Sequence, residues 1–244
     1  MLFLYLKFIY LSSSLKYTLG LGGYVKGMMI VNFKTYEEGT GKRGIELASV
    51  IEEVSKGGGT EIAIAVQPTD IRTLAENVHI PIFSQHVDPI TYGKHTGWIL
   101  PESVKEAGAK GTLLNHSERR ISFEIIKRSI ERCREIGLQT VVCADTPETV
   151  KKIARLEPDL IAIEPPELIG GEVPVSKAKP ELIIRSVEEA RPFGIPVLCG
   201  AGIKTGEDVR KAKELGVRGI IVASGVVKSE NPKEAIKNLL EGFG

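Results

Sequence analysis

The sequence has little that would tie it to an oxidising compartment, a nucleic acid or a membrane. Its three cysteines, Cys133, Cys143 and Cys199, are odd in number and form no Cys-x-x-Cys pair, which excludes a disulfide framework and a thiolate zinc site. The formal net charge is only +1, from 32 basic and 31 acidic residues, so the chain offers no electrostatic footprint for nucleic acid or an anionic membrane. These absences favour a cytoplasmic protein whose main partner is a small molecule.

Acidic residues are missing from the first 27 residues, which carry three lysines. The remaining 217 residues therefore hold 29 basic and 31 acidic groups, a net charge of −2. A lysine interrupts the apolar stretch of this front piece, which is shorter than a transmembrane helix of about 20 residues and lacks the basic start of a secretory signal. An added strand or helix is an alternative, although no period is sustained. We expect residues 1–27 to be an extension, and the functional chain to begin at Met28 or Met29.

A length of 244 residues, with 42% hydrophobic and 26% charged side chains, fits two average domains or one large α/β barrel. From Met28 onward, short apolar runs alternate with stretches of helical period, which is typical of repeated βα units around a parallel sheet. Eight strands are predicted, at Met28–Phe33, Glu61–Val66, Ile80–Ser84, Lys110–Leu113, Gln139–Cys143, Leu160–Ile163, Ile195–Leu198 and Gly219–Val222.

Between the strands, helices are predicted in stretches such as Gly44–Lys56, Ser122–Ile136, Thr146–Leu156, Pro180–Ala190, Gly206–Leu215 and Asn231–Leu240. Thr146, Thr205 and Asn231 stand just ahead of proline or acidic residues, as residues that cap a helix N-terminus do. Eight units without a long insertion favour a closed barrel over an open, doubly wound sheet. The prediction is one α/β domain, residues 28–244, folded as a (β/α)8 barrel.

In such barrels the chemistry gathers where strands end, and two strand ends carry polar side chains. The first predicted strand ends in Asn32-Phe33-Lys34, which places a cation at the barrel mouth, although a lysine there can equally be a solvated surface charge. The fourth leads into Asn115-His116-Ser117-Glu118. A lone histidine is usually structural or superficial, but one at a strand end ahead of helix-capping residues is well placed for acid–base work.

Three further strand ends suggest a base, a lid and a phosphate site. Glu164 ends an apolar strand, where burial raises a carboxyl pKa toward that of a usable base. Prolines before and glycines after Glu167-Leu168-Ile169 predict a stiff segment with mobile ends, unless it is an ordinary connecting loop. Small residues in Cys199-Gly200-Ala201-Gly202-Ile203 and Ala223-Ser224-Gly225 let a phosphate approach main-chain N–H groups.

The remaining histidines favour structure over metal binding. His79, His86 and His95 could suggest a metal site, with Asp88 close to His86. Asp88-Pro89 is explained more simply as a turn. The sequence therefore predicts no metal site.

Together these motifs resemble the triosephosphate isomerase family, and most closely its short archaeal branch. They are Asn32-Phe33-Lys34, Asn115-His116-Ser117-Glu118-Arg119, Glu164–Gly170 and Ala223-Ser224-Gly225, in this order over nearly all of residues 28–244. The stretches Ser84–Pro89, Val175–Pro180 and Leu198–Ile203 resemble the same branch. The resemblance implies a cofactor-free interconversion of dihydroxyacetone phosphate and D-glyceraldehyde 3-phosphate through an enediolate, in glycolysis and gluconeogenesis.

The resemblance also implies roles for particular residues. Glu164 would accept the proton, a neutral His116 at the front of a helix would be the electrophile, and Lys34 would act by its charge. Glu118 would orient neighbouring groups. Contacts with substrate are implied for Asn32, Phe33, Lys34, Ile169, Gly170, Gly202, Ala223, Ser224 and Gly225.

Two departures from the common family pattern bear on the site. Asn115 precedes the histidine where most family members have glycine, although the archaeal branch shares the asparagine. Gly171-Glu172 stands where Thr-Gly is usual, and a carboxylate there could slow closure of the lid or weaken phosphate binding unless it points outward.

Two other functions and the assembly remain open at this point. A metal-dependent phosphosugar epimerase would use the same phosphate turns, but it needs His and Asp ligands at several strand ends. A barrel that only binds a phosphometabolite would not require Lys34, His116 and Glu164. The archaeal resemblance implies a homotetramer, with a dimer as the alternative, and Tyr92–Trp98 corresponds to the family's interface loop.

Overall fold

The computed structural model describes residues 27–57, 59–165 and 179–244. Within them, eight parallel strands follow one another around a closed barrel. The strands are β1 (Gly27–Asn32), β2 (Thr60–Val66), β3 (Ile82–Ser84), β4 (Gly111–Leu114), β5 (Gln139–Ala144), β6 (Leu160–Ile163), β7 (Val197–Cys199) and β8 (Gly219–Val222). Pairing of Met28 with Gly219 joins β1 to β8 and closes the ring. The predicted (β/α)8 barrel is confirmed, and Gly27, which we assigned to the extension, begins β1.

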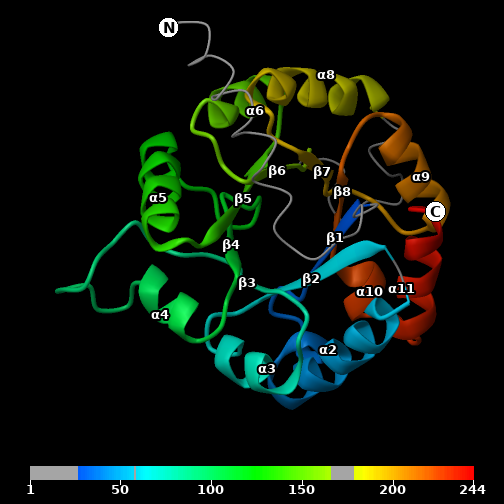
Figure 1. Ribbon diagram of the computed structural model, residues 1–244, viewed down its shortest axis with the longest axis horizontal. Coiled ribbons are helices and arrows are strands. Elements are labelled where there is room, and N and C mark those ends of the chain that lie inside the picture. Colours follow the sequence, from blue (N-terminus) through cyan, green and yellow to red (C-terminus); the bar gives the residue numbers. More distant parts are fainter. Residues whose placement is uncertain (1–26, 58, 166–178) are drawn as a thin grey trace, which may run out of the picture.

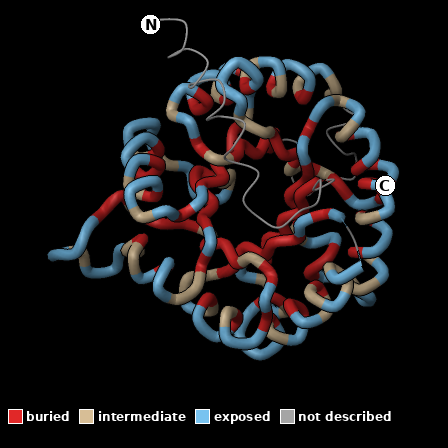
Figure 2. Tube along the Cα trace, in the orientation of Figure 1, coloured by how far each residue is buried: buried red, intermediate tan, exposed pale blue. Residues whose placement is uncertain are grey.

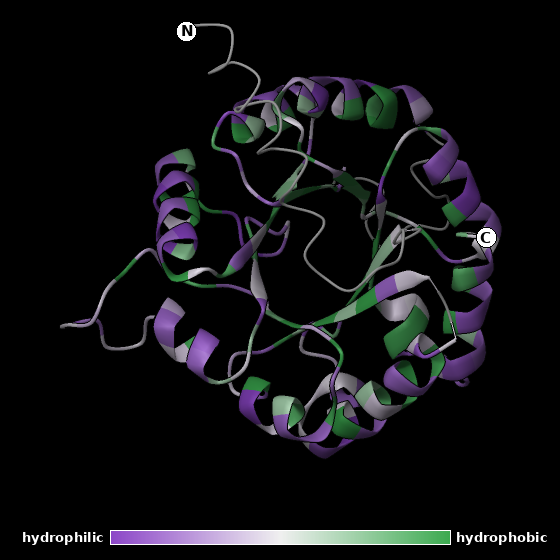
Figure 3. Ribbon diagram, in the orientation of Figure 1, coloured by the Kyte–Doolittle hydropathy of each residue, from purple (hydrophilic) through white to green (hydrophobic). Residues whose placement is uncertain are grey.

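The helices form an outer ring around the strands (Figure 1). They are α2 (Gly41–Ser55), α3 (Ile71–Asn77), α4 (Pro101–Glu106), α5 (Phe123–Ile136), α6 (Pro147–Ala154), α8 (Pro180–Ala190), α9 (Gly206–Glu214), α10 (Ser224–Val227) and α11 (Pro232–Glu241), with short 3-10 turns at Glu37–Gly39 and Arg191–Phe193. Their hydrophilic residues lie on the outer side (Figure 3). Among the described residues, no helix has both the length and the apolar character that crossing a membrane requires.

The predicted helix starts are confirmed by their caps. The side chains of Thr146, Thr205 and Asn231 each accept a hydrogen bond from the backbone N–H three residues ahead, as does that of Ser122. The side chain of Asp208, at position N3 of this helix, in turn accepts from the backbone N–H of Thr205, which completes a capping box. These short polar side chains satisfy N–H groups that the first helical turn leaves without a partner.

Two strands begin two residues later than predicted, and proline explains both. We expected β3 to begin at Ile80 and β7 at Ile195, whereas they begin at Ile82 and Val197. Pro81 and Pro196 stand in between and have no N–H to give to the ladder, although their carbonyls still accept from Ile64 and Ile161. The apolar run alone predicts burial, and the missing donor decides where pairing starts.

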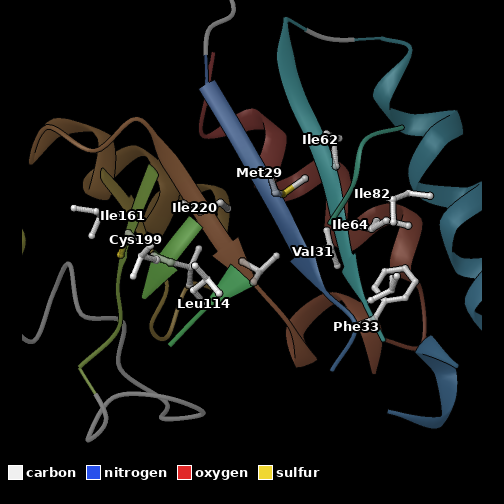
Figure 4. Close-up of a cluster of buried hydrophobic side chains, with 14 of the residues drawn as sticks. Met29, Val31, Phe33, Ile62, Ile64, Ile82, Leu114, Ile161, Cys199 and Ile220 are labelled. Atoms are coloured by element: carbon white, nitrogen blue, oxygen red, sulfur yellow. The ribbon is translucent and has the colours of Figure 1, made fainter. Parts of the chain in front are cut away.

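Alternate strand residues enter two different cores. Met28 and Ile30 belong to an inner cluster that is built from strand residues only, and therefore fills the barrel. Met29 and Val31 belong to a larger cluster that also contains helix residues, and therefore lies between the strands and the outer ring (Figure 4). Burial is concentrated accordingly in the strands and in the helix faces toward them (Figure 2). Because successive side chains of a strand point to opposite faces, every second one points into the interior of the barrel.

Candidate active site

A pocket of about 230 Å³ lies where the strands end, and it brings together eight of the predicted site residues. These are Asn32, Lys34, His116, Glu164, Gly202, Ala223, Ser224 and Gly225. The predicted contacts Ile169 and Gly170, and Glu172 of the lid segment, lie outside the described residues. The pocket therefore gathers groups from both ends of the chain, as the carboxyl end of a barrel does.

Glu164 reaches the pocket because it continues the inward row of β6, after Leu160 and Ala162. Its side chain is only 4% exposed, and burial raises the pKa of the carboxyl, while the neighbouring His116 and a hydrogen bond from the Cys143 thiol act in the opposite direction. Burial also raises the pKa of Cys143 well above its usual value, so the thiol keeps the proton that it donates. Among the described residues, Glu164 Oε2 has no hydrogen-bond partner and faces His116 Nε2 at 3.8 Å.

His116 is held in one tautomer by the turn that follows it. The backbone N–H of Glu118 donates to His116 Nδ1 at 3.2 Å, and the N–H of Arg119 donates to the His116 carbonyl at 2.8 Å. A nitrogen that accepts from an N–H carries no proton, so the proton of a neutral ring sits on Nε2. Our expectation that His116 stands at the front of a helix is wrong, because α5 begins only at Phe123. The turn, and not a helix N-terminus, sets the tautomer of the ring.

Lys34 and Glu118 form the charged side of the pocket. Lys34 Nζ lies 2.6 Å from Glu118 Oε1, and the lysine side chain is 15% exposed. Asn32 Oδ1 accepts from the backbone N–H of Lys34 at 3.0 Å, so the amide fixes the turn that carries the lysine. The predicted orienting role of Glu118 agrees with this geometry, since the residue contacts both Lys34 and His116.

The opposite side of the pocket is made of small residues with free backbone donors. Gly202 has a φ of +70°, a left-handed conformation that glycine adopts without strain. The N–H groups of Gly202, Ser224 and Gly225 find no acceptor among the described residues. Lys204, which the sequence analysis did not single out, adds a second cation to the lining. Small residues, free N–H groups and a cation are the features of an anion site.

Phe33 does not line the pocket, unlike its neighbours Asn32 and Lys34. Its side chain is fully buried in the outer cluster, and its N–H already donates to the Ala65 carbonyl at 2.9 Å. Odd residues of β1 face the helices, which is why Phe33 points away while Asn32 points inward. The predicted contact between Phe33 and substrate therefore has neither a side chain nor an N–H to make it.

Sequence reasoning missed two residues that contact Glu164. A Cβ built on Gly200 would lie 2.5 Å from Glu164 Cγ, so the glycine leaves room for the carboxylate. Cys143 comes from the inward row of β5 and donates its thiol hydrogen. For Cys143, the position at the end of an apolar strand is the signal in the sequence that could have indicated a contact with the site. For Gly200, the sequence analysis assigns the whole motif to phosphate binding.

The structure explains how asparagine at position 115 can replace the glycine that is usual in the family. Its φ is +58°, a left-handed conformation that asparagine tolerates better than other residues with a side chain. The Asn115 amide donates to the Cys143 carbonyl at 2.9 Å and accepts from the Ile121 N–H at 3.1 Å. Asparagine thus replaces the freedom of glycine with two hydrogen bonds that hold the His116 turn against β5.

We expect Asn115→Ala to be less stable than Asn115→Gly by about 1 kcal/mol, because alanine adds left-handed strain to the loss of the same two hydrogen bonds. Both variants should be less stable than wild type by about 1–3 kcal/mol. Urea unfolding measures the three free energies. An alanine variant more stable than the glycine variant would contradict a left-handed Asn115.

His86 and Asp88, the pair that could suggest a metal, are engaged in structure. His86 Nε2 lies 3.2 Å from Asp88 Oδ1, while Asp88 Oδ2 accepts from the Ile99 N–H at 2.7 Å. Burial lowers the pKa of His86 and outweighs the nearby carboxylate. In the ranges that the structure covers, no three His, Cys, Asp or Glu side chains gather as metal ligands do.

Comparison with known proteins identifies the family. The sequence model described as triosephosphate isomerase matches residues 27–239. Triosephosphate isomerase of Methanocaldococcus jannaschii is 48% identical over 217 residues, which cover 88% of this chain and 99% of that protein. The enzyme of Sulfurisphaera tokodaii is 49% identical over 214 residues, covering 87% of this chain and 93% of that protein.

The fold agrees with that of a solved triosephosphate isomerase structure. A crystal structure of triosephosphate isomerase from Bartonella henselae superposes with a TM-score of 0.66 at 19% identity, covering 83% of this chain and 94% of that one. At this identity the likeness supports the barrel alone. The family match and the archaeal relatives, which span nearly the whole described barrel, show that this chain belongs to the triosephosphate isomerase family.

Proposed function

We propose that this chain interconverts dihydroxyacetone phosphate and D-glyceraldehyde 3-phosphate through an enediolate, with Glu164 as the base and no cofactor. The observation that carries this proposal is the pair formed by Glu164 and His116 in one pocket, 3.8 Å apart. One group is a buried carboxylate whose raised pKa suits proton abstraction. The other is the His116 ring, whose Nε2–H faces the same pocket.

The proton moves between two neighbouring carbons of the substrate. Glu164 removes it from the carbon beside the carbonyl, and the electron pair of that C–H bond becomes the C=C bond of the enediolate. The carbonyl oxygen gains the negative charge, which the Nε2–H of His116 stabilises by a hydrogen bond. The hydroxyl proton of the neighbouring carbon passes to the former carbonyl oxygen through His116, and return of the first proton from Glu164 to the other carbon gives the isomeric triose phosphate.

Lys34 and the small-residue side of the pocket bind the two ends of the anion. Lys34 supplies positive charge next to the developing enediolate, with Asn32 holding its backbone. The free N–H groups of Gly202, Ser224 and Gly225 donate to the phosphate, beside Ala223. By the family resemblance, Ile169 and Gly170 complete the site when the lid closes and excludes water.

Turnover of the purified full chain tests the proposal directly. Isomerisation of D-glyceraldehyde 3-phosphate should be fast and unchanged by EDTA, which separates this activity from a metal-dependent epimerase. A protein that binds inorganic phosphate without turning over triose phosphate would instead be a binding barrel. We further propose that the reaction serves glycolysis and gluconeogenesis in the cytoplasm.

We also propose a homo-oligomer, with a tetramer favoured over a dimer. The exposed side chains of Tyr92 and Trp98, 73% and 53% accessible, lie on the loop between β3 and α4, whose base is closed by two hydrogen bonds between Asp88 and Ile99. A closed base with an apolar tip favours docking against a second copy.

Light scattering should therefore give a multiple of the monomer mass for the wild type. The double variant Tyr92→Asp and Trp98→Asp should shift the protein to smaller species, because charge replaces the apolar tip. Phe193→Asp is the matched control, since Phe193 is 37% exposed on a 3-10 turn elsewhere and should leave the mass unchanged. A monomeric wild type would refute the assembly.

A further inference from the structure

Lys34 has a backbone conformation that needs support. Its φ is +48°, in the left-handed region, which costs an L-residue with a side chain roughly 1–2 kcal/mol. Unlike Asn115, which shares this conformation, lysine has no short polar side chain that bonds its own backbone. Something outside the residue must hold the turn, since the position of this ammonium group depends on it.

Asn32 holds the N–H of Lys34, and the support for its carbonyl comes from Gln85, directly after β3. Its Nε2 donates to the Lys34 carbonyl at 2.8 Å, and lies 3.3 Å from both Asn32 Oδ1 and the Ala65 carbonyl. The Gln85 backbone is itself fixed, because its N–H donates to the Val66 carbonyl at 3.0 Å. One side-chain amide therefore ties together the carboxyl ends of β1, β2 and β3.

We propose that Gln85 is a positioning residue for the isomerisation, which sets the place of the Lys34 ammonium by clamping the Lys34 backbone. Gln85 does not line the pocket that holds Glu164; it lines a neighbouring hollow of about 260 Å³ that shares Asn32, Lys34 and His116 with that pocket. It therefore acts through Lys34 and Asn32. The inference rests on the proposed function of the site.

An amide is the side chain that this place requires. Three oxygen acceptors converge on Gln85 Nε2, and an NH2 group offers them two hydrogens without adding charge beside the Lys34–Glu118 ion pair. A carboxylate would present only acceptors to these oxygens, and an apolar side chain would leave the Lys34 carbonyl without its donor. Loss of the clamp frees Lys34 to leave its strained conformation, which weakens the hold on the anion.

The experiment compares Gln85→Met with a matched control, Gln67→Met. Gln67 follows the neighbouring strand β2 and lines the same hollow, but its amide donates to Thr40 Oγ1 and not to Lys34. We expect Gln85→Met to lower kcat/KM about tenfold, mainly by raising KM, and to weaken inhibition by inorganic phosphate to a similar degree. That loss corresponds to about 1.4 kcal/mol. Gln67→Met should stay within twofold of wild type.

A double-mutant cycle with Lys34→Met separates positioning from a general structural defect. If Gln85 acts through the ammonium, Gln85→Met should cause no further loss once Lys34 is replaced. Binding of inorganic phosphate, measured as the rise in the thermal unfolding midpoint, gives the same cycle without turnover. A wild type that binds phosphate but lacks turnover would thus refute the proposed function and still test Gln85.

Three outcomes would overturn the inference. The first is that Gln85→Met behaves like Gln67→Met. The second is that the loss of kcat/KM caused by Gln85→Met persists undiminished in the Lys34→Met background. The third is that neither variant of Gln85 folds. Gln85→Asn is the second variant, because it keeps the amide but shortens its reach by one methylene group, and it should lose as much as Gln85→Met. If neither Gln85 variant folds, the amide serves the stability of the barrel rather than the place of Lys34.

Discussion

Replacing Glu164 by glutamine should lower kcat/KM by about 10³-fold while leaving the protein at least as stable as wild type. General-base catalysis contributes about 10²–10⁴-fold, and glutamine cannot accept the proton. Glu164→Asp keeps the charge but withdraws the carboxylate by one methylene group, and a displacement of this size costs about 10²-fold. Steady-state kinetics in both directions measures these losses. Full turnover in both variants would refute the role of Glu164.

The sign of the stability change follows from the raised pKa of Glu164. A carboxyl whose pKa is higher in the folded state contributes stability that is fully present below its unfolded pKa, and loses it as the pH rises through the folded value. At neutral pH the ionised, buried carboxylate therefore opposes folding, and the neutral glutamine removes that cost. The midpoint of thermal unfolding at pH 7 should rise in Glu164→Gln. A fall in this midpoint would contradict a buried base whose Oε2 has no partner among the described residues.

The same pKa fixes the acid side of the pH profile. Glu164 must be ionised to accept a proton, so kcat/KM should fall as the pH drops through a pKa that burial places above the ordinary value of a glutamate. The acid side should be absent in Glu164→Gln. An acid midpoint at or below the ordinary glutamate value would show that the carboxylate is better solvated than this pocket allows.

Gly200→Ala should lower kcat about 10²-fold without unfolding the protein. The new methyl carbon would lie 2.5 Å from Glu164 Cγ, 2.6 Å from Ile221 Cγ2 and 2.7 Å from Glu164 Oε1, so the carboxylate must move. A displacement of about 1 Å in a catalytic group costs about 10²-fold in rate, whereas overpacking of this size costs about 1–3 kcal/mol in stability. The glycine acts by the space it leaves for the base.

Gly57→Ala is the matched control for this change. A Cβ at Gly57 would come no closer than 3.9 Å to the Val54 carbonyl, so kinetics should match wild type. Because the glycine acts through Glu164, Gly200→Ala should cause little further loss in a Glu164→Gln background. Kinetics of the four variants, with thermal unfolding alongside, checks the argument. A Gly200→Ala enzyme with normal kcat would show that Glu164 does not occupy the place described.

Much of the active site can be predicted from the sequence because each group stands at a strand end. Strand parity alone places Asn32 and Glu164 among the inward residues, and the pocket contains both. The same parity excludes Phe33, which follows Asn32 by one position and faces the helices. The assignment of Phe33 to the substrate came from the family motif, and a motif does not record which way each of its members points.

Other features depend on contacts between distant segments, which no local pattern records. The tautomer of His116 is set by the N–H of Glu118 in a turn, where we expected the front of a helix. The space beside Glu164 depends on Gly200, 36 positions away in the chain and adjacent through the β6–β7 pairing. The clamp on Lys34 comes from Gln85 of a third strand.

The sequence by itself determined the eight alternating units, the helix caps and the strand ends that carry the chemistry, because periodicity, capping and burial are local properties of a chain. The tertiary structure alone decided where β3 and β7 begin to pair, which neighbours shift the pKa of Glu164, and what holds the strained turn at Lys34. These depend on closure of the barrel, which brings eight separate strand ends to one place and so decides which groups bond to and bury one another there.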